Sequence, residues 1–232
     1  MTPTVLGNQA DSSPERRSPI PKGCEQLLVV RSEGWTTTSA TLQRYAREKD
    51  ADWQAVGDAI HVNVGRHGMA WGRGLHDSQP GPAKLEGDGR TPAGVFPVGA
   101  LFGYAEQPPA DADTAMPYIH FHVGTECVED PRSPLYNRIV DTAPGSPLIR
   151  ADGVFRLGFV IDQNAPDTVA GAGSCVFFHV QRGPSQATSG CTSASFADVQ
   201  ALVGWLDARA RPVVVELPEG EYTRLKNDWG LP

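Results

Sequence analysis

A histidine and a cysteine in the last third of the chain carry the side chains that nucleophilic catalysis needs. His179 ends the apolar run 174–180, and Cys191 follows 12 positions later in a polar stretch. Small neighbours leave a thiol accessible and let backbone amides, here those of Gly190 and Cys191, converge on an oxyanion. The pair therefore indicates a cysteine nucleophile with an imidazole as its general base. The small residues that flank the cysteine are Ser189, Gly190, Thr192 and Ser193.

Spacing alone leaves structural roles open for the same residues. A lone cysteine is commonly a small buried hydrophobe, and a histidine at a strand end is commonly a packed structural residue. Cys175 lies inside the apolar run and is expected to be inert. Cys127 begins a polar segment, where it could line a site, pair with another cysteine or only pack. Cys24 precedes the first expected strand and is predicted to lie outside the core.

A metal site is the other chemistry that the histidines allow. His120 and His122 are two residues apart on an expected strand, so they share a face and could bind zinc together with His179. No further ligand has a recognisable spacing, and the phosphate-binding pattern GxxxxGK[ST] is absent. We therefore expect no metal and no other cofactor.

The elements that position these residues are expected to be mainly strands. Gly and Pro together number 45 of 232 residues, which favours many turns over a helical bundle. Short helices are predicted after Ser39 and after Ser195, the second with its positive end just beyond Cys191, where it would favour a thiolate. Segments 65–94 and 181–194 are expected to be loops. The expected strands are 26–30, 53–57, 59–64, 94–98, 118–123, 155–161, 174–180 and 212–218.

We expect one domain, a mostly β sandwich or open barrel with a few peripheral helices. It should span 25–218, between a disordered N-terminal arm at 1–24 and a C-terminal tail at 219–232. The net charge of −7 provides no basic footprint for nucleic acid. No apolar run is long enough for a membrane span, and no secretory signal is visible.

Four ordered segments resemble the L,D-transpeptidase catalytic domain family of bacterial cell-wall enzymes. The first is KLEGDGRTPAGVF at 84–96, and the second is CVEDPRSPLYN at 127–137. The third joins GSCVFFH at 173–179 to TSGCT at 188–192, and the last runs from WLD at 205 to LP at 218. The resemblance covers roughly 26–218 and implies the fold described above.

The resemblance implies that Cys191 is the nucleophile, His179 the general base, and Gly190 and Cys191 the oxyanion amides. It implies a thioester formed with a peptidoglycan tetrapeptide at the L-centre of its third residue, with loss of D-Ala. Transfer to a neighbouring stem amine would give a 3→3 crosslink. Transfer to water would make the protein an L,D-carboxypeptidase or related cysteine hydrolase, and a catalytically idle wall-binding module is a further alternative. A periplasmic or envelope location, a monomer, acylation by carbapenems and a role in cell shape are also implied.

The chain departs from the family pattern around its cysteine. Many members have a second histidine where this chain has Ser189, and an apolar residue followed by Arg where it has Thr192 and Ser193. The spacing from His179 to Cys191 is also shorter than in most members. These departures bear on how substrate is oriented. The residues expected to contact substrate are Thr188, Ser189, Thr192, Asn164, Lys84, Asp88 and Tyr136.

Overall fold

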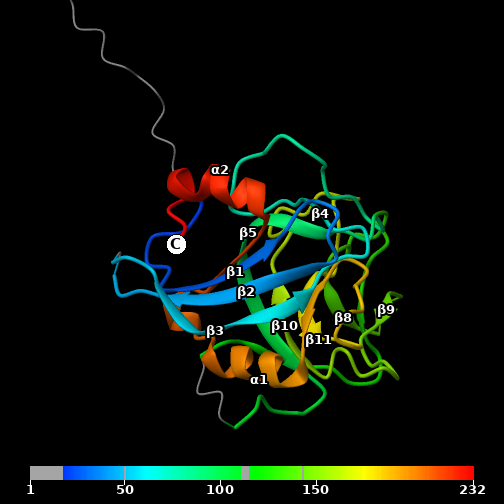
Figure 1. Ribbon diagram of the computed structural model, residues 1–232. Coiled ribbons are helices and arrows are strands. Elements are labelled where there is room, and N and C mark those ends of the chain that lie inside the picture. Colours follow the sequence, from blue (N-terminus) through cyan, green and yellow to red (C-terminus); the bar gives the residue numbers. More distant parts are fainter. Residues whose placement is uncertain (1–17, 50, 111–114, 143) are drawn as a thin grey trace, which may run out of the picture.

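The computed structural model describes residues 18–49, 51–110, 115–142 and 144–232, and its main feature is one large β-sheet (Figure 1). The mostly β prediction is confirmed. The strands of this sheet are β1 (Gln26–Ser32), β2 (Ser39–Ala46), β3 (Gln54–Asn63), β4 (Met69–Trp71), β5 (Thr91–Gly103), β6 (Tyr118–His120), β10 (Leu157–Ile161), β11 (Phe177–Val180), β12 (Thr192–Ala194) and β13 (Val213–Pro218). Their order is β10-β11-β12-β3-β2-β1-β13-β5-β4, with β6 beside β5.

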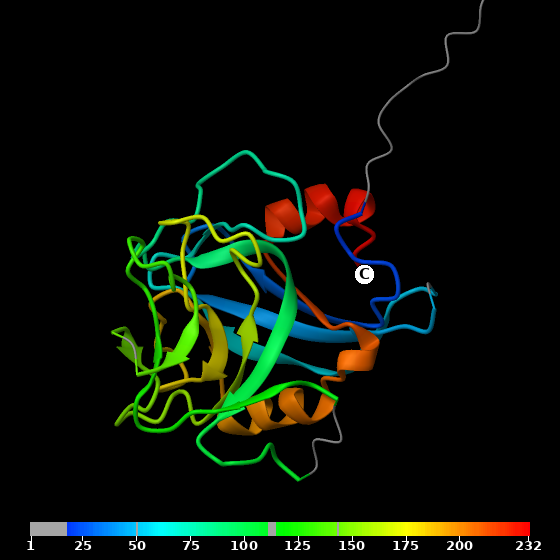
Figure 2. The same cartoon turned by 180° about the vertical axis from the view of Figure 1, so that it is seen from behind.

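The long strand β5 closes this sheet into a barrel. It pairs in succession with β4, β13 and β10. Because β10 is the first strand of the order given above, its pairing with β5 closes the sheet on itself. Figure 2 shows the strong curvature that β5 needs to do this. Gly94 lies in the curved part with φ +143°, and a Cβ there would come within 1.9 Å of His76 Nε2. The bend therefore depends on a residue without a side chain.

A second, smaller sheet flanks one end of the barrel. It consists of β7 (Thr125–Cys127), β8 (Ile139–Asp141) and β9 (Ser146–Pro147). A disulfide from Cys127 to Cys175 links this sheet to the segment that precedes β11. The buried residues around the link form a separate core cluster, which includes Phe102, Phe121, Leu148 and Phe177.

Helices α1 (Phe196–Trp205) and α2 (Glu219–Trp229) cover two sides of the barrel, with the short 3-10 helix η1 (Ala208–Ala210) between them in sequence. Ser195 caps α1 as predicted, accepting a hydrogen bond from the Asp198 amide. The expected helix face is buried except at Phe196, which is 44% exposed. In the described part of the chain, no helix combines the length and apolarity needed to cross a bilayer.

Several local predictions were wrong because strand pairing overrides local preference. The segment after Ser39 is strand β2, which pairs with β1 over its whole length. The expected hairpin at 53–64 is the single strand β3, in which Gly57 (φ +64°) lies at a register shift opposite β2. Both expected loops also contain strands: β4 and the start of β5 lie within 65–94, and β12 lies within 181–194.

Both ends of the described chain pack against the barrel, contrary to the predicted arm and tail. Residues 1–17 of the predicted arm lie outside the described residues. Of the remainder, Ile20 and Cys24 are buried, and Cys24 is part of the main core. The predicted tail is mostly α2, whose Tyr222, Leu225 and Trp229 are buried. The Trp229 ring stacks on His76 at 5.4 Å between ring centroids.

Replacing Trp229 with alanine should strongly destabilise the protein, because it empties the contact between α2 and the barrel. We expect a loss of about 3 kcal/mol and a Tm lower by roughly 6–12 °C. Asn227→Ala, an exposed change on the same helix, is the matched control and should cost at most about 0.5 kcal/mol. Thermal unfolding followed by circular dichroism measures both. Equal Tm values for the two variants would mean that α2 behaves as a loose tail.

Candidate active site

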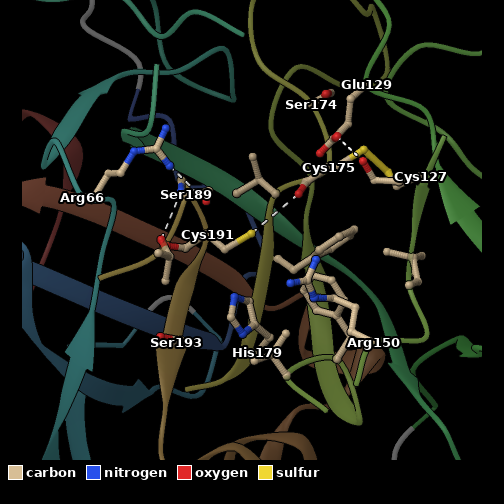
Figure 3. Close-up of a pocket in the computed structure, with 18 of the residues that line it drawn as sticks. Arg66, Cys127, Glu129, Arg150, Ser174, Cys175, His179, Ser189, Cys191 and Ser193 are labelled. Carbon is tan, nitrogen blue, oxygen red and sulfur yellow. Dashed lines mark hydrogen bonds between the residues drawn. A yellow bond between two sulfur atoms is a disulfide. The ribbon is translucent and has the colours of Figure 1, made fainter. Parts of the chain in front are cut away.

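One pocket of about 400 Å³ contains both residues singled out by the sequence (Figure 3). Its walls come from the end of the loop at 181–191, from strand β11, from the segment around Lys84 and from the small sheet. The pocket therefore lies where the barrel meets the disulfide-linked flank.

The pairing of β11 with β12 explains why His179 and Cys191 face the same space. The two strands are parallel, and Phe178 lies opposite Thr192 while His179 lies opposite Ser193. Side chains alternate between the faces of a strand, so His179 and Ser193 share one face. Continuing the alternation by two residues places Cys191, just before β12, on that face as well. Thr192 points to the opposite face.

His179 is positioned as a proton acceptor. Its side chain is 7% exposed, and Nδ1 lies 2.9 Å from the Val180 carbonyl oxygen. A carbonyl can only accept, so Nδ1 carries the proton and Nε2 keeps its lone pair. Burial lowers the pKa of His179 to about 4. The imidazole is therefore neutral at physiological pH.

The Cys191 thiol is also neutral in this resting arrangement. Burial raises its pKa to about 12, while a backbone hydrogen bond from Phe177 acts in the opposite direction. Sγ lies 3.7 Å from the Cys175 carbonyl oxygen, to which the thiol donates (Figure 3). The pocket therefore holds a neutral thiol and a neutral imidazole rather than a preformed thiolate–imidazolium pair.

The expected help from a helix dipole is not present. The three residues of β12 and the cap residue Ser195 separate Cys191 from the start of α1, and β12 alone spans about 10 Å. The influence of a helix end falls off within its first turn. The positive end of α1 therefore does not stabilise a thiolate at Cys191.

Two threonines hold the loop that carries Cys191. Thr188 Oγ1 donates to the Cys191 carbonyl oxygen at 2.5 Å and accepts from the Gly190 amide at 3.1 Å. Thr91 Oγ1 donates to the same carbonyl at 3.0 Å and accepts from the Gly65 amide at 2.9 Å. Thr91 was not predicted as a site residue, although it lies in the motif at 84–96. In this state the Gly190 amide is already engaged within the loop.

Of the residues expected to contact substrate, Lys84, Thr188 and Ser189 line the pocket. Lys84 is 7% exposed and its Nζ lies 2.5 Å from Asp88 Oδ1. Asp88 itself does not line the pocket, because its carboxylate accepts from the Leu85 and Arg90 amides and closes the turn.

Tyr136, Asn164 and Thr192 also lie behind the pocket wall rather than on it. The Tyr136 hydroxyl donates to Glu86, and Asn164 bonds to backbone groups of Val169 and Gly173. Thr192 points inward and donates to the buried Glu216 carboxylate at 2.5 Å. These three residues support the site through loops and strands.

Charged residues that the sequence did not indicate also line the pocket: Arg66, Glu129, Arg150 and Arg182. They come from four separate segments, and only Glu129 lies in one of the motifs noted in the sequence, at 127–137. Arg150 and Arg182 both pair with Asp152. Only tertiary structure brings these groups together.

The disulfide answers the open question about Cys127. It bonds to Cys175, with 6.0 Å between the Cα atoms, so Cys175 is not a free buried thiol. Both sulfur-bearing residues line the pocket. The disulfide fixes the segment around Cys175, whose carbonyl oxygen accepts the hydrogen bond from the Cys191 thiol.

The zinc alternative has no geometric support in the described residues. No three His, Cys, Asp or Glu side chains among them come together as a metal site. His122 Nε2 instead lies 3.4 Å from Asp141 Oδ1. His120, His122 and His179 therefore do not form a ligand set.

Comparison with known families identifies the family of the chain. The model of the YkuD family, described as the L,D-transpeptidase catalytic domain, matches residues 33–215. The chain belongs to the L,D-transpeptidase catalytic domain family, whose members are cell-wall enzymes that act on peptidoglycan. The matched range includes every strand pair that forms the pocket. A search of curated proteins finds no match.

Because Cys191 and His179 are both uncharged at rest, the Cys191 thiol should react slowly with alkylating agents. With a pKa of about 12 for Cys191, native protein at pH 7.5 should react with iodoacetamide at least about 100-fold more slowly than free cysteine, because only the thiolate reacts. Intact-protein mass spectrometry over time measures the rate, and urea-unfolded protein is the control that restores ordinary reactivity. A native rate that equals or exceeds that of free cysteine would show a preformed thiolate.

Proposed function

We propose that the protein is an L,D-transpeptidase that cuts a peptidoglycan tetrapeptide through a thioester at Cys191. The observation that carries the proposal is the shared orientation of Cys191 and His179 in one pocket of a chain that belongs to this family. The bond broken joins the L-centre of the third stem residue to the terminal D-Ala. The acyl group then passes to an amine of a neighbouring stem, which gives a 3→3 crosslink.

The neutral pair sets the order of proton transfers. His179 Nε2 takes the thiol proton as Sγ attacks the carbonyl carbon, since no thiolate is present beforehand. The Cys191 amide donates to the oxyanion, and the Gly190 amide joins it when its bond to Thr188 opens. The imidazolium then gives its proton to the departing D-Ala nitrogen. In the second half His179 takes a proton from the attacking amine as the new C–N bond forms, and returns it to the Cys191 sulfur as the thioester C–S bond breaks.

The disulfide supports a location outside the cytoplasm. Disulfides form and persist in oxidising compartments and are rare in reducing ones. The Cys127–Cys175 bond lies at the pocket wall. The disulfide supports a location in the periplasm or cell envelope, where the proposed substrate is found.

Replacing Cys191 with alanine should remove activity while leaving the fold intact. Release of D-Ala from a disaccharide-tetrapeptide should fall below about a hundredth of the wild-type rate, measured by mass spectrometry of the products. Cys24→Ala changes the other free cysteine and should retain activity. Crosslinked products would identify the acceptor as an amine, and tripeptide alone would identify it as water. Wild-type protein that binds the tetrapeptide without converting it would support the idle wall-binding alternative.

The buried histidine predicts an unusual pH dependence. A base must be unprotonated, and the pKa of His179 is lowered to about 4, so kcat/KM should stay high as the pH falls and decline only near pH 4. A histidine with the ordinary pKa of 6.5 would instead place this acidic limb of the pH–rate profile near pH 6.5. His179→Gln should cut the rate by at least about 10²-fold and abolish the limb. A wild-type limb near 6.5 would contradict the buried, neutral imidazole.

A further inference from the structure

We propose that Arg66 binds the free carboxylate at the end of the donor peptide and so selects peptides that are cut one residue from their C-terminus. The inference rests on the proposed function and assigns a specificity-determining residue to it. Arg66 is exposed and lines the pocket that contains Cys191 and His179.

Arg66 is attached directly to the loop that carries the nucleophile. Its amide donates to the Thr188 carbonyl at 2.8 Å, and Gly65 forms a parallel bridge with Thr188. Its guanidinium donates from NH1 to Ser189 Oγ at 3.0 Å (Figure 3). Ser189 lies two residues before Cys191, so their Cα atoms are at most about 7 Å apart. The guanidinium is therefore held at a fixed place on the loop that carries Cys191.

Its charge is uncompensated, unlike those of the other cations of the pocket. Lys84 pairs with Asp88, and Arg150 and Arg182 pair with Asp152. Within the residues that the structure describes, no carboxylate lies in ion-pair distance of Arg66. Arg66 is thus the cation that remains available to a ligand.

The backbone beside Arg66 leaves room for its side chain. Gly89 has φ +68°, and a Cβ at this position would come within 3.0 Å of Arg66 Cζ and Nε. A larger residue would both strain the backbone and displace the guanidinium. The glycine of the motif at 84–96 therefore maintains the space in which the guanidinium lies.

A terminal carboxylate is the ligand that fits this position. The guanidinium is planar and binds a carboxylate through two parallel hydrogen bonds. In a tetrapeptide, the terminal carboxylate carbon lies one residue beyond the scissile carbonyl, at most about 3.6 Å along the chain. With the carbonyl at Sγ, that carboxylate would lie within one residue's length of the loop on which the guanidinium is held at Ser189. A peptide that continued past this point would present a neutral peptide carbonyl at this position, with its carboxylate further away.

The test compares two tetrapeptides that differ only in their last group, a free carboxylate or a carboxamide. We would measure kcat/KM with both for wild type, Arg66→Gln, Arg66→Lys and Arg182→Gln. Wild type should prefer the carboxylate by about 10- to 100-fold, in line with a charge-assisted hydrogen-bonded pair. Arg66→Gln should lose the preference by slowing only the carboxylate peptide, and Arg66→Lys should keep part of it. Arg182→Gln should leave the ratio unchanged.

Binding of the same two peptides to the Cys191→Ala protein separates this proposal from the proposed function. Tighter binding of the carboxylate form that disappears in the Cys191→Ala, Arg66→Gln double variant supports the carboxylate site, even if wild type releases no D-Ala. Release of D-Ala without any preference, or a preference that survives Arg66→Gln, would overturn the assignment of Arg66 and leave the thioester chemistry standing. In that case the hydrogen bond from Arg66 to Ser189 serves only to hold the loop.

Discussion

The register of the parallel pair β11–β12 is the constraint on which the site depends. Because side chains alternate along a strand, a slip of one residue would turn Cys191 into the barrel and bring Thr192 to the pocket. Contacts on both faces oppose such a slip. On the inner face Thr192 donates to Glu216, a fully buried carboxyl group whose pKa burial raises to about 8. On the loop side Thr91 and Thr188 both hold the carbonyl of Cys191.

Burial determines the electrostatics of the same site. The enclosure that lowers the pKa of His179 raises that of Cys191, so both groups are uncharged at rest. In the proposed reaction, charge would develop only when substrate is attacked, where oriented amides would stabilise it. Such a thiol is protected from incidental oxidants and alkylating agents, because these react with thiolates. The disulfide beside it fixes the carbonyl of Cys175, to which the thiol donates.

The sequence predicts the parts of this arrangement that are local or carried by motifs. The run at 174–180, the small residues around Cys191 and the cap at Ser195 are visible as patterns, and they locate the pair and the helix that follows. The segment at 39–46 could not be assigned correctly, because its partner β1 decides its conformation. The inward direction of Thr192 and the gathering of Arg66, Glu129 and Arg150 depend on distant segments meeting. The pairing of Cys127 with Cys175 likewise requires the fold.

The central claim is that a thioester forms at Cys191 with His179 as the base. Rapid acid quenching of protein mixed with tetrapeptide, followed by peptide mapping in a mass spectrometer, tests it most directly. The thioester should appear as the mass of the tripeptide acyl group on the fragment that contains Cys191, at the same rate as D-Ala is released. It should be suppressed in His179→Gln. Release of D-Ala with no acyl group on that fragment at any quench time, or an acyl group on another residue, would contradict the claim.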